Sequence, residues 1–281
     1  MTYTSRAPAA ALAPWVERIG VQHSDDVDPD HPPTRILPTG TFDLVFHYGD
    51  AFVKHGPGGP RTEPLAYVSA HRLAPIEVSA TGRTGIVIVA LHPWGLEALL
   101  GAPADEMAGT DGALDAHVPA AELARLRERL AEAPGASARM DLVETWLVER
   151  LRPSLDPLAR AAALQLTLDG GTTRIGALAD ALAVSRRQLD RRFRHAVGYT
   201  PKAFARVLRF QRAVGVLRCG AACAEVAALA GYHDQAHMHR ELLALAGQTP
   251  AALRPAEVDT PLMAHFNGAG MSRFYNTVYL G

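Results

Sequence analysis

The chain has 281 residues, of which 48% are hydrophobic and 20% charged, and its formal net charge at pH 7 is −1. This composition excludes a disordered or collagen-like protein, and two cysteines cannot form a framework of disulfide bonds. The sequence contains no apolar run of about 18 residues and no secretion signal, so we expect a cytoplasmic protein with no membrane partner. A nearly neutral chain by itself argues against binding to nucleic acid.

The charge, however, is distributed unevenly. Residues 171–255 contain 13 basic and 5 acidic residues, a net charge of +8, whereas the remainder contains 15 basic and 24 acidic residues, a net charge of −9. A basic third within an otherwise acidic chain favours a part that faces nucleic acid. A solvated charged surface is the alternative interpretation.

The first half of the chain predicts a β-rich mixed domain. A short helix is expected around 14–20, an acidic and proline-rich loop over 24–33, and another short helix at 94–100. Apolar segments separated by glycine and proline predict strands at 41–48, 66–69, 76–79 and 85–91.

Two amphipathic helices are expected at 120–133 and 138–151, because apolar residues recur at spacings of three and four. Pro134 and Gly135 separate them, so they should form an antiparallel pair. This pair is a candidate dimer interface, and packing onto the core of its own domain fits the pattern equally well. The segment 152–157 resembles a linker between domains.

Beyond the linker the pattern predicts helices only. They are expected at 158–168, 174–182, 186–197, 201–219, 225–230 and 235–246. Four residues are suited to cap helix starts: Thr173, Ser185, Thr200 (before Pro201) and Asp234. A final short helix is expected after Thr249, which also precedes a proline.

Residues 175–201 and 223–250 repeat one plan. Each has a short helix rich in alanine, a turn of three or four residues, a capped helix of about three turns, and then glycine and Thr-Pro. This is the helix-turn-helix arrangement, present twice. One such helix pair occurs in many bundles, but two in tandem within the basic region favour DNA binding.

Both repeats contain motifs of a known family. In the first they are Leu178-Ala179, residues 184–189 (VSRRQL), Phe193, Gly198 and Thr200-Pro201. In the second they are residues 225–227 (EVA), 230–235 (AGYHDQ), Arg240 and 247–250 (GQTP). On these residues the region 158–255 resembles the DNA-binding domain of the AraC/XylS family of transcription regulators.

The resemblance implies an α+β fold, in which a β-rich mixed N-terminal domain precedes an all-α domain with two helix-turn-helix motifs. Residues 36–38 (ILP) and 91–95 (LHPWG) are similar to a small sensor domain found before this module in some members. We therefore assign 1–152 to a sensor or dimerisation domain, 153–255 to the DNA-binding domain and 256–281 to a C-terminal tail.

The resemblance implies that Arg187, Asp190 and Arg191 touch bases in the first motif. They share one stripe of their helix, opposite an apolar stripe that contains Leu189 and Phe193. Arginine can bind guanine O6 and N7, and aspartate can accept from cytosine N4. Three further arginines are expected at phosphates, namely Arg186, Arg192 and Arg194.

In the second motif the matching positions are Gln235, Ala236, His237 and Arg240. The family's usual pattern is absent at Met238, His239 and Leu242, and basic residues are scarce, so we expect weaker engagement of DNA by this motif. The helix between the motifs should be about 28 Å long, shorter than one DNA turn of about 34 Å. This difference predicts a DNA bend or a loosely held second motif.

No catalytic, phosphate-binding or metal-binding motif is present, and Cys219 with Cys223 alone cannot hold a metal. We therefore expect no enzymatic activity, no cofactor and no metal. The expected partner is duplex DNA in its major groove; a small-molecule effector, a second copy of the chain and RNA polymerase are further candidates. An enzyme with a helical appendage and a protein-binding adaptor are the competing interpretations.

Overall fold

The computed structural model describes residues 2–26, 28, 31–109 and 111–254, so the proposed C-terminal tail lies outside the described residues. The chain divides into two compact units. The first comprises Met1–Thr34, Thr41–His71 and Ile76–Leu155, and the second comprises Arg35–Gly40, Arg72–Pro75 and the chain from Asp156 onward. The predicted linker 152–157 contains this division, and the roles assigned to the two parts remain predictions.

The chain before the linker forms two β-sheets. The six-stranded sheet has the order β1 (Thr2–Arg6), β2 (Val16–Ser24), β9 (Thr84–Leu91), β4 (Asp43–His47), β7 (Ala66–Ser69) and β10 (Gly112–Ala113), with every neighbouring pair antiparallel. The four-stranded sheet has the order β3 (Thr34–Ile36), β8 (Ile76–Ala80), β5 (Phe52–His55) and β6 (Arg61–Thr62).

The register gives the six-stranded sheet two chemically different faces. On one face Val21, Val87 and Phe46 lie in a row across β2, β9 and β4 and belong to the apolar core. On the other face Gln22 and His47 flank Ile86 in the adjacent row, and both polar side chains are buried. Because side chains alternate along a strand, each strand supplies both faces.

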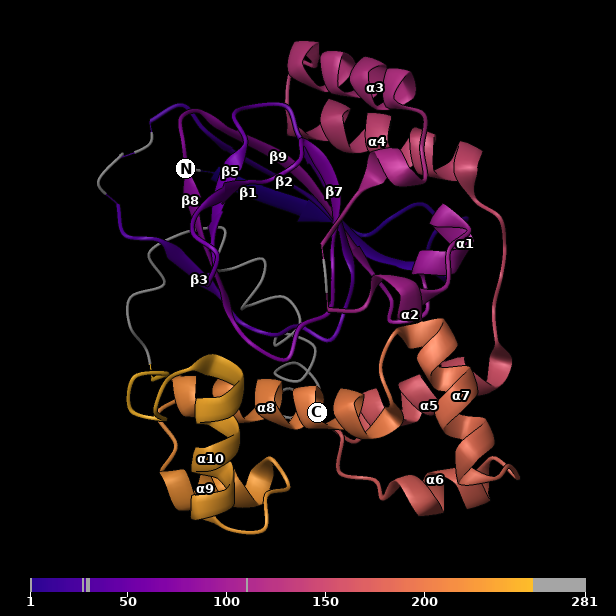
Figure 1. Ribbon diagram of the computed structural model, residues 1–281, viewed down its shortest axis with the longest axis vertical. Coiled ribbons are helices and arrows are strands. Elements are labelled where there is room, and N and C mark those ends of the chain that lie inside the picture. The colour runs from indigo at the N-terminus through magenta and orange to yellow at the C-terminus, as the bar shows by residue number, and fades with distance from the viewer. Residues whose placement is uncertain (1, 27, 29–30, 110, 255–281) are drawn as a thin grey trace. The chain divides into compact units, whose positions relative to one another are not determined.

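Helices cover the apolar face. After α1 (Leu96–Leu100), α2 (Ala104–Met107) and a short 3₁₀ turn at Leu114–Ala116 come α3 (Ala120–Glu132) and α4 (Ala136–Arg150). These two helices lie side by side, and α4 contacts β2 and β9 (Figure 1). Their apolar stripes, which include Leu130, Val143 and Leu147, are buried in the core of the same unit. This favours internal packing over a dimer interface as the reason for the stripes.

The predicted strands at 41–48, 66–69, 76–79 and 85–91 are confirmed within one or two residues at each end. The helix expected around 14–20 is wrong, because Val16 begins the long strand β2. This strand pairs with the apolar strand β9 over its whole length, and such pairing overrides local helix propensity. The polar edge strand β1 was missed because its sequence, TYTSR, lacks apolar alternation.

The second unit is helical over its described part from Asp156 to Arg254. Its helices are α5 (Pro157–Leu168), α6 (Ile175–Ala181), α7 (Arg186–Val197), α8 (Pro201–Arg218), α9 (Cys223–Leu229) and α10 (Gln235–Ala246). The predicted fold class, α+β with a β-rich part before an all-α part, is therefore confirmed. Among the described residues, no helix is both long and apolar enough to cross a membrane.

The helix caps largely follow the sequence. Ser185 forms a capping box with Gln188, and Thr200 and Asp234 accept from the backbone N–H of residues three positions later. The cap predicted at Thr173 is wrong, because α6 begins at Ile175 without a side-chain cap and the Thr173 hydroxyl donates to the Asp169 carboxylate. The helix predicted after Thr249 is a turn.

Substitution of Phe193 in α7 by alanine should destabilise the protein by about 3–5 kcal/mol, because a fully buried aromatic ring is removed and a cavity is left. The neighbouring Arg194 is exposed, so Arg194→Ala should change stability by less than about 0.5 kcal/mol. Urea denaturation of the full-length variants measures both values. Equal effects would contradict the burial of Phe193 in the core beneath α7.

Candidate nucleic-acid interface

The two helix-turn-helix units share one turn geometry. In the first, the N–H of Val184 donates to the carbonyl oxygen of Ala179 at 3.1 Å; in the second, Tyr232 donates to Ala227 at 2.9 Å. The residue before each donor has a left-handed backbone, with φ of 53° at Ala183 and 73° at Gly231. The predicted repeat is therefore a repeat of three-dimensional structure.

The second helices of the two units, α7 and α10, correspond residue by residue at a spacing of 49. Both follow a capping residue, Ser185 or Asp234, and both end at a left-handed glycine. Their buried residues match at four positions: Leu189 with Met238, Phe193 with Leu242, Ala196 with Leu245, and Val197 with Ala246. This correspondence also pairs the outward residues of the two helices.

Helix α7 presents an arginine-rich outer face. Arg187 and Arg191 are exposed and Asp190 is half-buried, as their predicted common stripe requires. Arg186 and Arg194 are also exposed. Within the part of the chain that the structure describes, none of these four arginines forms an ion pair. The assignment of individual base and phosphate contacts stays a prediction.

Arg192 differs from its neighbours because it is paired inside the protein. Its Nε lies 2.7 Å from Oδ2 of Asp156, and its Nη2 lies 2.6 Å from Oδ1. The same carboxylate caps α5 by accepting from the N–H groups of Leu158 and Ala159. The predicted phosphate contact of Arg192 would require this bidentate pair to open, so Arg192 is better placed to fix α7 against α5.

The environment of Asp156 lowers its pKa. Partial burial alone would raise the pKa, but hydrogen bonds from Arg192 and from two backbone N–H groups outweigh burial. The carboxylate is therefore charged at neutral pH, and its interactions contribute to the stability of the folded state.

Helix α10 presents a different face. Gln235, Ala236 and Arg240 are exposed as expected, but His237 is half-buried and meets the ring of Tyr232 edge-on at 5.3 Å. His237 corresponds to Gln188, whose side chain completes the cap of α7. The counterpart of Asp190 is the exposed His239, which the sequence mapping missed. Counting from the capping residue of each helix would have found it.

Other arginines of the basic region hold the helices together. Arg206 of α8 pairs with Glu241 of α10, and Arg209 donates to the carbonyl oxygen of Gly171 at 2.6 Å. Arg254 donates to the carbonyl oxygens of Gly220 and Ala221. Some arginines of the basic region therefore bind carboxylate or carbonyl oxygens inside the protein. The arginines without such an internal contact among the described residues are concentrated on α7.

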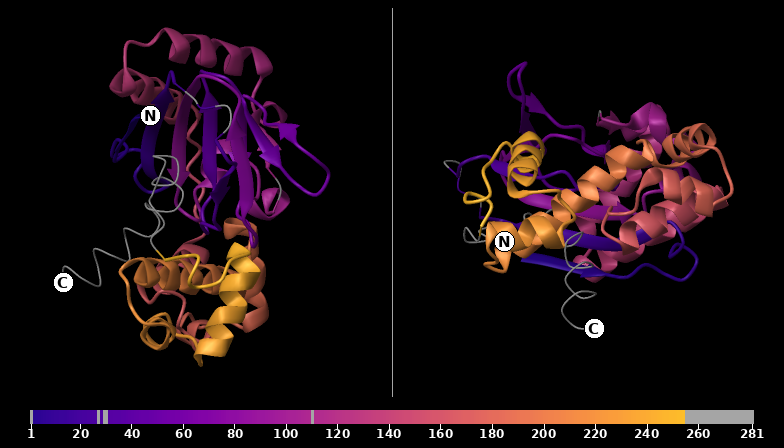
Figure 2. Two further views of the ribbon diagram at one scale, coloured as in Figure 1. Left: turned by 90° about the vertical axis from the view of Figure 1, so that its left-hand side faces the viewer. Right: turned by 90° about the horizontal axis from the view of Figure 1, so that it is seen from below.

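Helix α8 connects the two helix-turn-helix motifs as one unbroken helix (Figure 2). Its 18 residues correspond to a length of about 27 Å. It packs against α5, α7, α9 and α10, so both helix-turn-helix motifs are built on one rigid element. This length predicts a DNA bend or a loosely held second helix-turn-helix motif, and both stay predictions.

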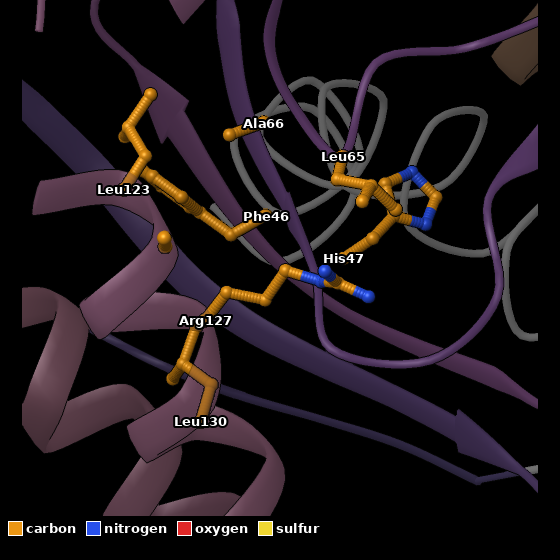
Figure 3. Close-up of a pocket in the computed structure, with 8 residues that line it drawn as sticks. Phe46, His47, Leu65, Ala66, Leu123, Arg127 and Leu130 are labelled. Atoms are coloured by element: carbon orange, nitrogen blue, oxygen red, sulfur yellow. The ribbon is translucent and has the colours of Figure 1, made fainter. Parts of the chain in front are cut away.

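The first unit contains a cavity of about 180 Å³ between α3 and the end of β4. Its walls are mostly apolar: Phe46, Leu65, Ala66, Leu123, Ala124 and Leu130. Arg127 also lines it, and Figure 3 shows Leu123, Arg127 and Leu130 following one another along α3. Arg127 is exposed and has no ion-pair partner among the described residues, so it can meet an anion.

His47 borders this cavity from β4 but its ring belongs to the polar side of the sheet. Phe46 and His47 leave the strand in different directions (Figure 3), and the imidazole contacts the rings of Phe52 and Tyr67. Burial lowers the pKa of His47 to about 4, although its hydrogen bond to the carbonyl of Asp50 opposes the shift. The ring is therefore neutral at pH 7, and its Nε2 has no hydrogen-bond partner among the described residues.

Metal ligands are not gathered anywhere in the described residues: no group of three or more His, Cys, Asp or Glu could hold an ion. Within the described residues, Cys219 and Cys223 are not joined in a disulfide bond.

Comparisons with known proteins agree with this geometry. Residues 178–256 match the model of a family described as "Helix-turn-helix domain", and residues 4–112 match a "Domain of unknown function (DUF6597)". No curated protein matches the chain. The chain thus carries a tandem helix-turn-helix domain, the module of DNA-binding regulators. The domain is of the AraC type, so the resemblance expected from the sequence is confirmed for residues 178–256.

Solved structures with a similar fold are distant. The C-terminal domain of AraT, a response regulator from Geobacillus stearothermophilus, is 19% identical, with 40% of this chain and 99% of that chain covered and a TM-score of 0.35. ToxT from Vibrio cholerae with a bound unsaturated fatty acid is 8% identical, with 84% and 94% covered and a TM-score of 0.45. The xylose-binding transcription activator XylR is 18% identical, with 42% and 39% covered and a TM-score of 0.32. At these values the likenesses carry no functional argument.

Replacing Asp156 by asparagine should preserve the cap of α5 but remove the charge that Arg192 binds. Because the folded-state pKa of Asp156 is lowered, its contribution is complete above the ordinary aspartate value of about 3.9 and is lost as the pH falls further. Urea denaturation should therefore show D156N less stable than the parent at pH 7, with the difference shrinking in acid. A difference independent of pH would argue against the ion pair.

Proposed function

We propose that this protein is a one-component transcription regulator whose helical unit binds specific duplex DNA in the major groove and whose β-rich unit senses a small molecule. The observation that carries the proposal is the outer face of α7, where Arg186, Arg187, Arg191 and Arg194 are exposed without ion-pair partners among the described residues. Exposed arginines that do not pair within the protein are suited to phosphates and guanine.

In the proposed complex, Arg187 and Arg191 donate to guanine O6 and N7, and Asp190 accepts from cytosine N4. Arg194 extends this stripe toward the end of α7, and its long side chain, like that of Arg186, contacts a phosphate. In the second helix-turn-helix motif the residues assigned to DNA contacts are Gln235, Ala236, His237 and Arg240. His239 joins them because it corresponds to Asp190. Since the two motifs follow one another along α8, the half-sites that they read lie on one side of the duplex.

Arg187→Ala and Arg191→Ala should each weaken binding to a selected operator by about 1–3 kcal/mol and relax base preference at one position. Arg192→Ala is the comparison variant: because this neighbouring arginine is held by Asp156, its removal should lower the stability of the protein and leave the base preference unchanged. Fluorescence anisotropy with the full-length variants measures the affinities, with folding checked by circular dichroism. The assignment of α7 fails if both test variants bind the operator as tightly as the parent.

Two other functions compete with this proposal. An enzyme would need convergent catalytic groups in the β-rich unit, and a protein-binding adaptor would use the helix-turn-helix units without DNA. DNA binding through the α7 arginines releases counterions, so affinity must fall steeply as salt increases. An affinity independent of salt would favour the adaptor.

The sensing part of the proposal rests on the cavity beside α3. Apolar walls favour an apolar body, and Arg127 at the cavity favours a single negative charge. Helix α3 is fixed to α4 because Glu122 accepts from Trp146 at 2.6 Å and from Arg150 at 3.0 Å. Since α4 continues directly into the linker, a ligand that shifts α3 would act on the segment before the DNA-binding unit.

A small carboxylate with a compact apolar body tests this site. Cyclohexanecarboxylate should bind the full-length protein, and Arg127→Gln should weaken binding about tenfold by removing a charge-assisted hydrogen bond. The uncharged cyclohexanecarboxamide is the matched ligand control and should bind weakly to both proteins. Isothermal titration calorimetry measures these affinities. If acid and amide bind alike, Arg127 does not select an anion.

The remaining partners are part of the same proposal. A second copy of the chain and RNA polymerase are expected partners of a regulator that acts at promoters, and the cytoplasm is the expected location. We expect neither a catalytic activity nor a cofactor, because the proposed action is binding alone.

A further inference from the structure

The correspondence of α7 and α10 exposes a chemical difference between the two DNA-facing stripes. The stripe on α7 is formed by Arg187, Asp190, Arg191 and Arg194. Applying the spacing of 49 residues, the stripe on α10 is formed by Ala236, His239, Arg240 and Leu243. Two arginines of the first stripe are thus replaced by apolar residues in the second.

The apolar residues on α10 face outward and are not part of the core. Ala236 is exposed, and Leu243 has 55% of its surface exposed, whereas the adjacent Leu242 is completely buried. A leucine in the place of the exposed Arg194 leaves an apolar patch next to the cation of Arg240. The second stripe therefore combines apolar contact with one positive charge.

In the major groove, the methyl group of thymine is the apolar feature by which base pairs differ, and apolar side chains contact it. Charged and hydrogen-bonding side chains instead read guanine, cytosine and adenine. We propose that the two units read different chemistries: α7 reads G·C pairs through hydrogen bonds, and α10 reads thymine methyl groups through Ala236 and Leu243, with Arg240 positioning the helix. This inference deepens the proposed function and rests on it.

Two consequences follow from the difference. The operator is not a repeat of one half-site, so it fixes the direction in which the protein lies on the duplex. The half-site read by α10 also contributes less to the salt dependence of binding, because apolar contacts release no counterions.

The test uses full-length protein and duplexes that it selects from a random pool. Single thymines in each half-site are replaced by deoxyuridine, which removes only the methyl group. In the α10 half-site each contacted methyl should account for about a fourfold loss of affinity, the value for burying one such group. In the α7 half-site the same replacement should have no effect.

Protein variants assign the methyl effect to a side chain. Leu243→Ala should weaken binding to the thymine duplex and remove the loss on deoxyuridine substitution, since the two changes delete the same contact. The matched variant Arg194→Ala should weaken binding equally to both duplexes and reduce its salt dependence. Because both residues are exposed, both variants should keep the parent's circular dichroism spectrum.

The outcomes separate this inference from the proposed function. If the protein binds no duplex in a salt-dependent manner, the proposed function fails and the inference fails with it. If it binds selected DNA but deoxyuridine has no effect in the α10 half-site, or selection yields no thymine there, only the inference is overturned.

Discussion

Both helix-turn-helix units depend on the burial of one helix, α8. Phe204, near the start of α8, packs against Phe193 of the first helix-turn-helix motif, with ring centroids 5.6 Å apart. Further along α8, Phe210 and Val214 lie in the core of the second motif. Because each core is incomplete without α8, the spacing of α7 and α10 is fixed by a packed helix and not by a flexible loop. A chain that reads two half-sites needs such a fixed spacing, since a free joint would lose binding energy to the entropy of ordering it.

The same constraint explains how the arginines are used. Those near the helix contacts, such as Arg192 and Arg206, pair with carboxylates and hold α7 and α10 in place. Those on the far side of α7 have no such partner among the described residues. Exposed positive charges without a partner cost the folded protein little free energy in water, and they add to the affinity for DNA when phosphates approach. Position relative to the core, and not residue type, therefore separates structural arginines from candidate DNA contacts.

The β-rich unit shows a parallel division between packing and candidate binding. One face of its six-stranded sheet is closed by α3 and α4, while the cavity beside Arg127 lies where α3 covers the end of β4. Helix α3 is thus part of both the core and the proposed effector site. The direct continuation of its partner α4 into the linker gives the proposed sensor a covalent route to the DNA-binding unit.

The sequence by itself determined the local features: the strands with apolar runs, the capped helices, the tandem repeat and the basic region, because each is encoded by neighbouring residues. It did not determine β2, whose pairing with β9 replaces the helix expected near Val16. It also could not show that Arg192 is engaged by Asp156, 36 residues away, or that His239 takes the place of Asp190. These features depend on which side chains meet after folding, and only the tertiary structure decides that.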